Sequence, residues 1–211
     1  MIHQYDHMSA GLSACLKRRF FISLLMLLMI AGAHGSVAAQ EQAAFEVDPL
    51  NVGDKAPTFV MKKNGTTDYV FLRDYAGELR QPAVFRGATQ QVVILSFFAS
   101  WCKPCQKEAP VLAEIARGYE GRDVQLFFVN WGDSDREAAA WLASYGVEAN
   151  CLMDPFGANA KKFGVNTLPR TIIIDKQGYV QLIERGFSEE NEAHYREVVT
   201  TKVNELLNPP I

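Results

Sequence analysis

The sequence lacks a block of basic residues beyond its first twenty positions, and it lacks an apolar run long enough to cross a membrane. Its formal net charge is −3, so it does not carry the electrostatic footprint of a nucleic-acid-binding protein. The apolar run at residues 20–33 has 14 residues, whereas a membrane-spanning helix needs about 20. We therefore expect no nucleic-acid partner, and the 48% hydrophobic content is sufficient for a full core.

The apolar run is placed as in a secretory leader. It follows Lys17, Arg18 and Arg19, and it precedes small residues at 37–39 that suit a cleavage site. We expect residues 1–39 to be a signal peptide, with a retained N-terminal anchor as the alternative. In both cases the basic end stays cytoplasmic and the domain is exported. The expected product is periplasmic or otherwise exported, and it is soluble once the leader is cleaved.

Cysteine and histidine are also scarce, which limits metal chemistry. Without the leader, the cysteines are Cys102, Cys105 and Cys151, and the histidine is His194. Three cysteines cannot all pair within one molecule, so the sequence predicts a C-x-x-C pair and one spare thiol. A zinc site would need two more ligands, and only Cys151 and His194 are available. We expect no metal, with half of a zinc site or an inert structural disulfide as the minor alternatives.

Alternating strand and helix patterns predict an α/β fold. Residues 92–98 form an unbroken apolar run, which is typical of a central strand covered on both faces. Ser134 and Glu137 form a capping-box pattern before a helix. We expect residues 40–50 to be a flexible lead-in and residues 51–208 to form one domain, with a mixed central sheet and helices on both faces. The expected strands are 69–72, 92–98, 124–129, 151–153, 171–174 and 179–183, and the expected helices are 106–119, 134–144, 154–163 and 188–207.

The C-x-x-C pair has the setting of a reactive dithiol. Cys102 follows the predicted strand 92–98 where the chain turns into a helix, and free N–H groups at a helix N-terminus favour a thiolate. Lys103 adds a nearby cation, and Pro104 suits a first helical turn because its missing N–H would be unpaired there. Cys105 lies one turn further on the same face. We expect Cys102 to be the exposed attacking cysteine and Cys105 the sheltered resolving cysteine.

Three segments together resemble the thioredoxin superfamily, and more closely its TlpA/ResA-like branch of exported thiol-disulfide oxidoreductases, which is related to the redoxin and AhpC/TSA proteins. They are residues 52–57 (VGDKAP), 101–110 (WCKPCQKEAP) and 164–169 (GVNTLP). The resemblance covers about residues 50–207. It implies a thioredoxin-like fold with an N-terminal β extension, and protein thiol-disulfide exchange without a bound cofactor.

The resemblance also implies a substrate-binding surface around the cysteine pair. Pro169 would be a cis-proline facing the pair, and Leu168 would offer backbone groups to an extended substrate segment. Trp101 would pack beside the active-site loop, with a plain core position as the alternative. Lys103 and Pro104 complete the expected substrate-binding residues.

Glu108 matches the acidic residue of the branch's W-C-x-P-C-x-x-E pattern. It lies one turn past Cys105, so it is expected to take or return a proton as that thiol ionises. The alternative is a solvated glutamate on the helix surface. Cytosolic thioredoxins have a buried aspartate six residues before the first cysteine, where this chain has Ser96. That difference supports Glu108 as the proton handler.

The resemblance suggests reduction of disulfides in exported partner proteins, such as the cysteines of apocytochrome c. An exported reductase would need electrons from a membrane thiol carrier, because that compartment lacks a soluble dithiol-reducing pool. The alternatives are a disulfide-forming oxidant of the same fold, a thiol peroxidase and a copper-handling module. Two features have no role transferred from the family. We interpret residues 77–90 as a solvent loop, with a partner surface as the alternative, and Cys151 as a buried strand thiol.

Overall fold

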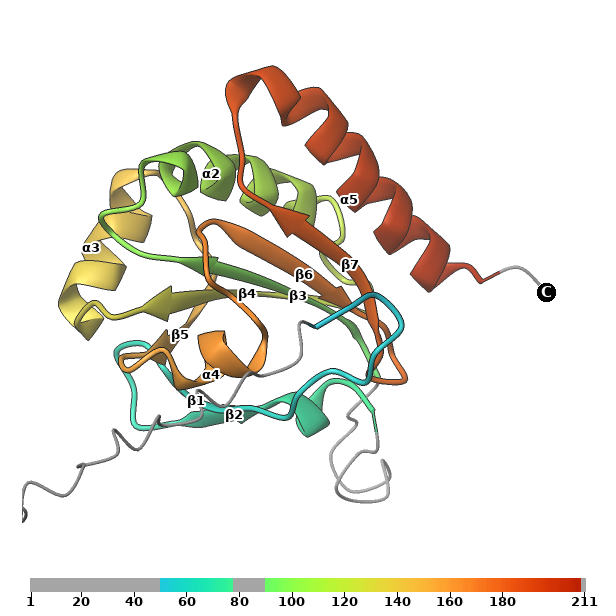
Figure 1. The fold of residues 1–211 in the computed structure, drawn as a ribbon, viewed down its shortest axis with the longest axis horizontal. Coiled ribbons are helices and arrows are strands. Elements are labelled where there is room, and N and C mark those ends of the chain that lie inside the picture. The colour runs from blue at the N-terminus through green and yellow to red at the C-terminus, as the bar shows by residue number, and fades with distance from the viewer. Residues whose placement is uncertain (1–49, 78–89, 210–211) are drawn as a thin grey trace, which may run out of the picture. The chain divides into compact units, whose positions relative to one another are not determined.

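Seven strands form one mixed sheet. The computed structural model describes residues 50–77 and 90–209, so the predicted leader, residues 40–49 of the lead-in and residues 78–89 of the predicted insertion lie outside the described residues. The strand order is β2-β1-β5-β4-β3-β6-β7 (Figure 1). The strands are β1 Val60–Lys63, β2 Tyr69–Phe71, β3 Val92–Phe98, β4 Val124–Trp131, β5 Asn150–Asp154, β6 Arg170–Ile174 and β7 Val180–Arg185.

The centre of the sheet is parallel and its edges are antiparallel. β3, β4 and β5 run parallel to one another, whereas β6 and β7 form an antiparallel hairpin beside β3. β1 and β2 form a second hairpin that pairs with β5, which is the expected N-terminal β extension. Every residue of β3 is buried, because elements cover both faces of the sheet, as the unbroken apolar run predicts.

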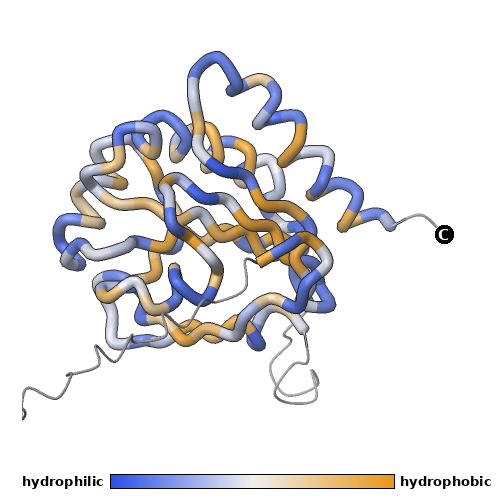
Figure 2. The backbone as a smooth tube through the Cα atoms, in the orientation of Figure 1, coloured by the Kyte–Doolittle hydropathy of each residue, from blue (hydrophilic) through white to orange (hydrophobic). Residues whose placement is uncertain are grey.

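Helices cover both faces, which confirms the predicted layers. Helices α2 (Lys103–Arg117), α3 (Asp135–Ser144) and α5 (Glu192–Leu207) share one core with one side of the sheet. The short α4 (Ala158–Lys162) and the 3-10 turn η1 (Leu72–Asp74) share a second core with the other side (Figure 1). Figure 2 shows hydrophobic residues along the central strands, and alternation with hydrophilic residues along the helices.

Helix ends follow the local sequence, with small differences from the prediction. α2 begins at Lys103 rather than residue 106, because Cys102 is its N-cap and Pro104 lies in its first turn. The capping box of Ser134 and Glu137 is present at α3. The last helix is preceded by a 3-10 turn, η3 (Glu189–Asn191). In the ranges 50–77 and 90–209, the chain contains no helix that has both the length and the apolar character to cross a bilayer.

Two glycines with the same φ angle provide a test of packing. Gly157 and Gly146 both have φ of 65°. A Cβ at Gly157 would overlap Nε1 of Trp131, whereas a Cβ at Gly146 would meet nothing within 4 Å. Gly146→Ala should therefore lose about 1 kcal/mol of unfolding free energy through its backbone conformation alone. Gly157→Ala should lose at least ~1 kcal/mol more, because the indole ring must move.

Urea unfolding of the two variants measures this difference. Equal losses for Gly157→Ala and Gly146→Ala would show that Trp131 does not pack closely against Gly157.

Candidate active site

The cysteine pair closes a disulfide at the start of α2. Cys102 and Cys105 are bonded, with their Cα atoms 5.4 Å apart. The backbone N–H of Cys105 donates to Sγ of Cys102 at 3.3 Å, so a free N–H of the first helical turn points at the first sulfur. Cys105 is completely buried and Cys102 is only 3% exposed. Cys102 is thus less accessible in the disulfide form than the sequence predicts, although it remains the more accessible of the two.

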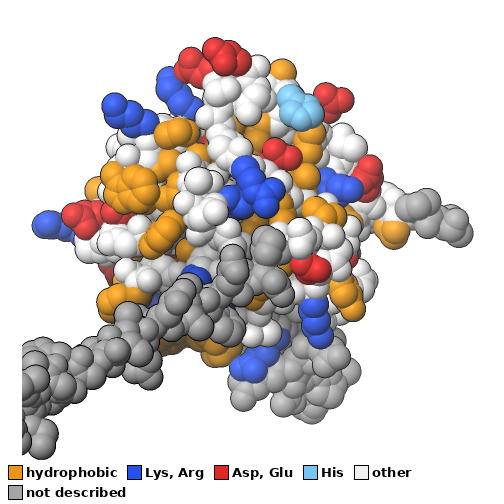
Figure 3. Space-filling view, in the orientation of Figure 1, with side chains coloured by type: hydrophobic (Ala, Val, Ile, Leu, Met, Phe, Trp, Pro, Cys, Tyr) orange, Lys and Arg blue, Asp and Glu red, His pale blue; other side chains and the backbone are white. Residues whose placement is uncertain are grey.

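Several side chains next to the pair in the chain are exposed. Trp101 is 68% exposed, which excludes the core position that was its alternative. Lys103 and Pro104 are also exposed. Phe156, in the connection after β5, is more exposed still. Because β3, β4 and β5 are parallel, their carboxyl ends and the loops that follow lie at the same end of the sheet. Figure 3 shows hydrophobic side chains among charged ones on the face of the molecule that it presents.

The loop before β6 reaches the same end of the sheet. The Leu168–Pro169 peptide bond is cis, as the resemblance implies. Arg170 pairs with Phe97 near the end of β3, so Pro169 lies beside the strand that leads to the cysteines. Leu168 packs against the hydrophobic cluster that contains both cysteines, and Pro169 is buried. The structure therefore brings the predicted substrate-binding residues to one region.

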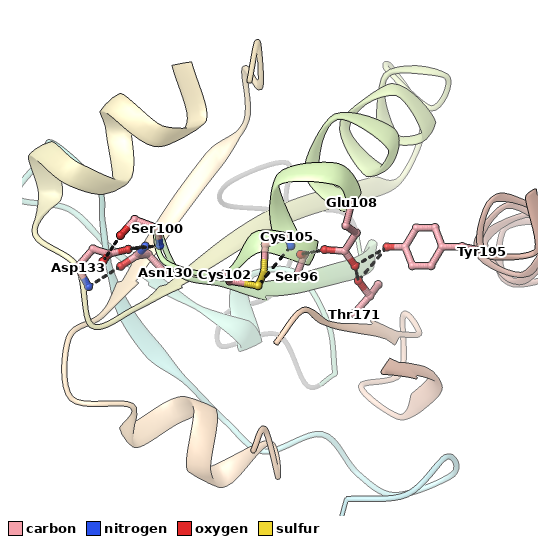
Figure 4. Close-up of a disulfide and its surroundings, with 9 residues drawn as sticks. All are labelled: Ser96, Ser100, Cys102, Cys105, Glu108, Asn130, Asp133, Thr171 and Tyr195. Carbon is pink, nitrogen blue, oxygen red and sulfur yellow. Dashed lines mark hydrogen bonds between the residues drawn. A yellow bond between two sulfur atoms is a disulfide. The ribbon is translucent and has the colours of Figure 1, made fainter. Parts of the chain in front are cut away.

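Glu108 is buried beneath the disulfide rather than solvated. It is 1% exposed, and its carboxylate accepts hydrogen bonds from three hydroxyl groups. These come from Ser96 at 2.9 Å, Thr171 at 2.6 Å and Tyr195 at 2.9 Å (Figure 4). Burial raises the pKa of Glu108 above its ordinary value, and the three hydroxyls oppose that rise without cancelling it.

Sequence reasoning missed Thr171 and Tyr195. A signal for Thr171 exists, because it is the one hydroxyl residue in the apolar strand β6 and it pairs in register with Ser96 of β3. Tyr195 has no comparable signal, since a tyrosine on an amphipathic helix is most simply a core residue. Burial and the neighbouring Glu108 raise the pKa of Tyr195 well above its usual value, so its hydroxyl is a hydrogen-bond donor here.

A second missed group fixes the loop that leads to Cys102. The Asp133 carboxylate accepts hydrogen bonds from the backbone N–H and the hydroxyl of Ser100, each at 2.7 Å. It also accepts one from the side-chain amide of the buried Asn130 at 2.7 Å (Figure 4). Asp133 therefore ties the β3–α2 loop to the end of β4. The signal was available, because polar residues after neighbouring parallel strands meet at one edge of the sheet.

A buried arginine supports the loop before the cis-proline. Arg170 is 2% exposed, and its Nη2 donates to Oδ1 of Asn166 at 3.1 Å and to Oγ1 of Thr167 at 3.0 Å. These bonds hold both polar side chains of the segment that precedes Leu168. Burial lowers the pKa of the guanidinium, with Arg185 of the adjacent strand as the second cause.

The remaining cysteine, Cys151, is a buried thiol in β5. This burial is as predicted, and it raises the pKa of Cys151 to about 12. Among the residues that the structure describes, no three histidine, cysteine, aspartate or glutamate side chains are grouped so that they could hold a metal ion.

Comparison with known proteins places this site in a family. The family model for AhpC/TSA proteins matches residues 52–183. The chain belongs to the AhpC/TSA family. Thiol-disulfide oxidoreductase ResA of Bacillus cereus is 28% identical over 185 residues, which cover 87% of this chain and 98% of ResA. ResA of Bacillus subtilis strain 168 is 28% identical over 178 residues, which cover 84% of this chain and 91% of that ResA.

A solved structure agrees with both the fold and the class of enzyme. The crystal structure assigned as a thiol:disulfide interchange protein DsbE from Chlorobium tepidum has a TM-score of 0.61 and 28% sequence identity. The match covers 73% of this chain and 99% of that one. This AhpC/TSA protein is therefore a thiol-disulfide oxidoreductase with a thioredoxin-like fold, as the sequence predicts.

The burial of Glu108 predicts a specific pH dependence of stability. Because its folded pKa is raised, the native state binds more protons than the unfolded state above the ordinary carboxyl pKa of about 4.3, and stability falls as the pH rises to the folded pKa. Glu108→Gln removes this titration. Relative to the variant, the wild-type disulfide form should lose about 1.4 kcal/mol per pH unit within that window.

Urea unfolding of both proteins between pH 5 and pH 8 tests this prediction. Glu114→Gln, an exposed substitution on the same helix, is the matched control and should follow the wild-type pH dependence. Parallel stability curves for the wild type and Glu108→Gln would contradict the burial of an ionisable carboxyl group.

Proposed function

We propose that this thiol-disulfide oxidoreductase reduces disulfides of exported partner proteins through Cys102 and Cys105. The observation that carries the proposal is the closed Cys102–Cys105 disulfide at a helix N-terminus, above a buried Glu108. A structural disulfide would not need a buried carboxyl group beneath it, since burial of an ionisable group is unfavourable. Thiol chemistry does use such a group, because the resolving thiol must lose its proton.

The first half of the reaction takes place at Cys102. In the dithiol form, its thiolate is stabilised by the N-terminus of α2, by the N–H of Cys105 and by the cation of Lys103. Sγ of Cys102 attacks one sulfur of the partner's disulfide. A mixed disulfide forms, and the partner's other sulfur leaves as a thiolate.

The second half takes place at Cys105 and closes the disulfide seen in the structure. The Cys105 thiol gives its proton to the Glu108 carboxylate, and its sulfur attacks Sγ of Cys102. The partner's second sulfur leaves as a thiolate, so two electrons pass to the partner and Glu108 ends as the neutral acid. The raised pKa of Glu108 supports this role, because it favours a carboxyl group that can take up the proton.

The substrate binds in this proposal as an extended segment beside the cis-proline. The backbone of Leu168 and Pro169 and the exposed side chains of Trp101, Lys103 and Pro104 would contact it. Apocytochrome c is a candidate partner. If residues 1–39 direct export, a membrane thiol reductant must return the protein to its dithiol form. The exchange itself needs no bound cofactor.

The role of Cys102 is tested by insulin-disulfide reduction. Cys102→Ser should abolish turnover, because Cys105 is completely buried and cannot reach a partner's disulfide in its place. Cys151→Ser is the matched control and should leave the rate unchanged, because that thiol is buried and its pKa is raised to about 12. Unchanged turnover in Cys102→Ser would refute the mechanism.

The resolving role of Cys105 predicts a trapped intermediate. Cys105→Ala leaves the mixed disulfide without its internal nucleophile, so partner proteins should accumulate covalently on Cys102. Non-reducing electrophoresis followed by mass spectrometry identifies these partners. The double variant Cys102→Ser/Cys105→Ala is the control, and adducts that persist in it would assign the attack to a different residue.

A further inference from the structure

The carboxyl group of Glu108 lies in a network of four short oxygen–oxygen contacts. Ser96 contacts Oε2, while Thr171 and Tyr195 both contact Oε1. The fourth contact joins Oγ1 of Thr171 to the hydroxyl of Tyr195 at 2.9 Å, and either atom can be its donor. Oε1 and the two hydroxyl oxygens therefore form a triangle (Figure 4).

The hydrogens available to this network depend on the charge of Glu108. The three hydroxyl groups supply three hydrogens for four contacts. When Glu108 is ionised, all three hydrogens point to the carboxylate, and the Thr171–Tyr195 contact has none. When Glu108 is protonated, its acid hydrogen is a fourth hydrogen for the network. If Oε1 carries this hydrogen, the hydroxyl groups can rotate so that each of the four contacts contains one hydrogen. The network can thus accommodate both charge states without moving a side chain.

The ionised state depends most on the hydroxyl donors. A buried carboxylate carries its charge among apolar residues, and hydrogen bonds to a charged acceptor are about twice as strong as neutral ones. The protonated carboxyl group has its own O–H donor, so it can form a hydrogen bond with a remaining hydroxyl when one hydroxyl is removed. Hydrogen bonds from Thr171, Tyr195 and Ser96 lower the pKa of Glu108, against the rise that burial causes. Donation by hydroxyls is therefore the force that opposes burial.

We propose that Tyr195 and Thr171 are positioning residues that keep the carboxylate form of Glu108 accessible inside the protein, and that helix α5 thereby belongs to the redox site. This inference rests on the proton-accepting role of Glu108 proposed above. The carboxylate must exist in the dithiol form to accept the Cys105 proton, and the acid must exist in the disulfide form. A site with burial alone would keep Glu108 protonated throughout.

The surroundings of the two residues suit this role. Tyr195 is 2% exposed, and its ring packs edge-on against Phe187, with centroids 5.2 Å apart. This packing holds the hydroxyl in place. The titratable groups next to the network are Cys105, one turn before Glu108 on α2, and Glu184 of β7, which pairs in register with Thr171. The negative charge of Glu184 acts on Tyr195.

The test measures the pH at which Glu108 titrates in the disulfide form. Infrared spectroscopy detects the C=O stretch of a protonated carboxyl group, and its loss in Glu108→Gln assigns the band. Tyr195→Phe removes one donor and keeps the ring, so the midpoint should rise by about one pH unit, a tenfold change in the proton-binding constant. Thr171→Val should also raise it, and Thr171→Ser, which restores a hydroxyl, should return it toward the wild-type value.

Tyr119→Phe is the matched control. Its hydroxyl also joins the end of α2 to α5, through the carbonyl of Thr200 and the side chain of Asn204, and it does not touch Glu108. The midpoint of the Glu108 titration in Tyr119→Phe should equal that of the wild type. A Tyr195→Phe midpoint that is unchanged, lowered, or no higher than that of Tyr119→Phe would overturn the inference. The titration requires no turnover, so its result is independent of the insulin assay.

Discussion

The direct passage of β3 into the N-terminus of α2 is the constraint on which the rest of the site depends. β3 is buried on both faces, so its position is fixed by the core, and Cys102 caps the helix that follows. The positive end of the helix dipole therefore stabilises negative charge on Sγ of Cys102. Asp133 fixes the short loop between the two elements through Ser100. The buried strand, the fixed loop and the helix cap together hold Cys102 at the N-terminus of α2.

Helix α2 also places an ionisable carboxyl group, Glu108, in the interior of the protein. Cys105 and Glu108 follow Cys102 at intervals of three residues, so both project from one side of α2 toward the sheet. An ionisable carboxyl group there is unfavourable unless polar groups meet it. Three elements each supply one hydroxyl: β3, β6 and α5. The site therefore consists of a cysteine pair at the N-terminus of α2 and a buried carboxyl group that is hydrogen-bonded to three hydroxyls.

Local patterns predicted six of the seven strands in the described part of the chain and missed β1 (Val60–Lys63). The site was harder to predict, because its residues meet through long-range contacts. The apolar run 92–98, the Ser134 capping box and the β6–β7 hairpin were predictable because neighbouring residues determine them. The cis bond before Pro169 was expected from resemblance alone. Tyr195 lies 87 residues from Glu108 in the chain, and no periodicity in the sequence shows which buried helix residue meets it. The low exposure of Cys102 also depends on how the surrounding loops pack.

The direction of electron flow is the central claim, and the reduction potential of the Cys102–Cys105 pair tests it most directly. The potential is obtained by equilibrating the protein with glutathione buffers of defined ratio and measuring the fraction of disulfide. A reductase requires a value near that of thioredoxin, about −270 mV. A value near −120 mV, typical of a strong disulfide-forming oxidant, would contradict the proposed reduction of partner disulfides.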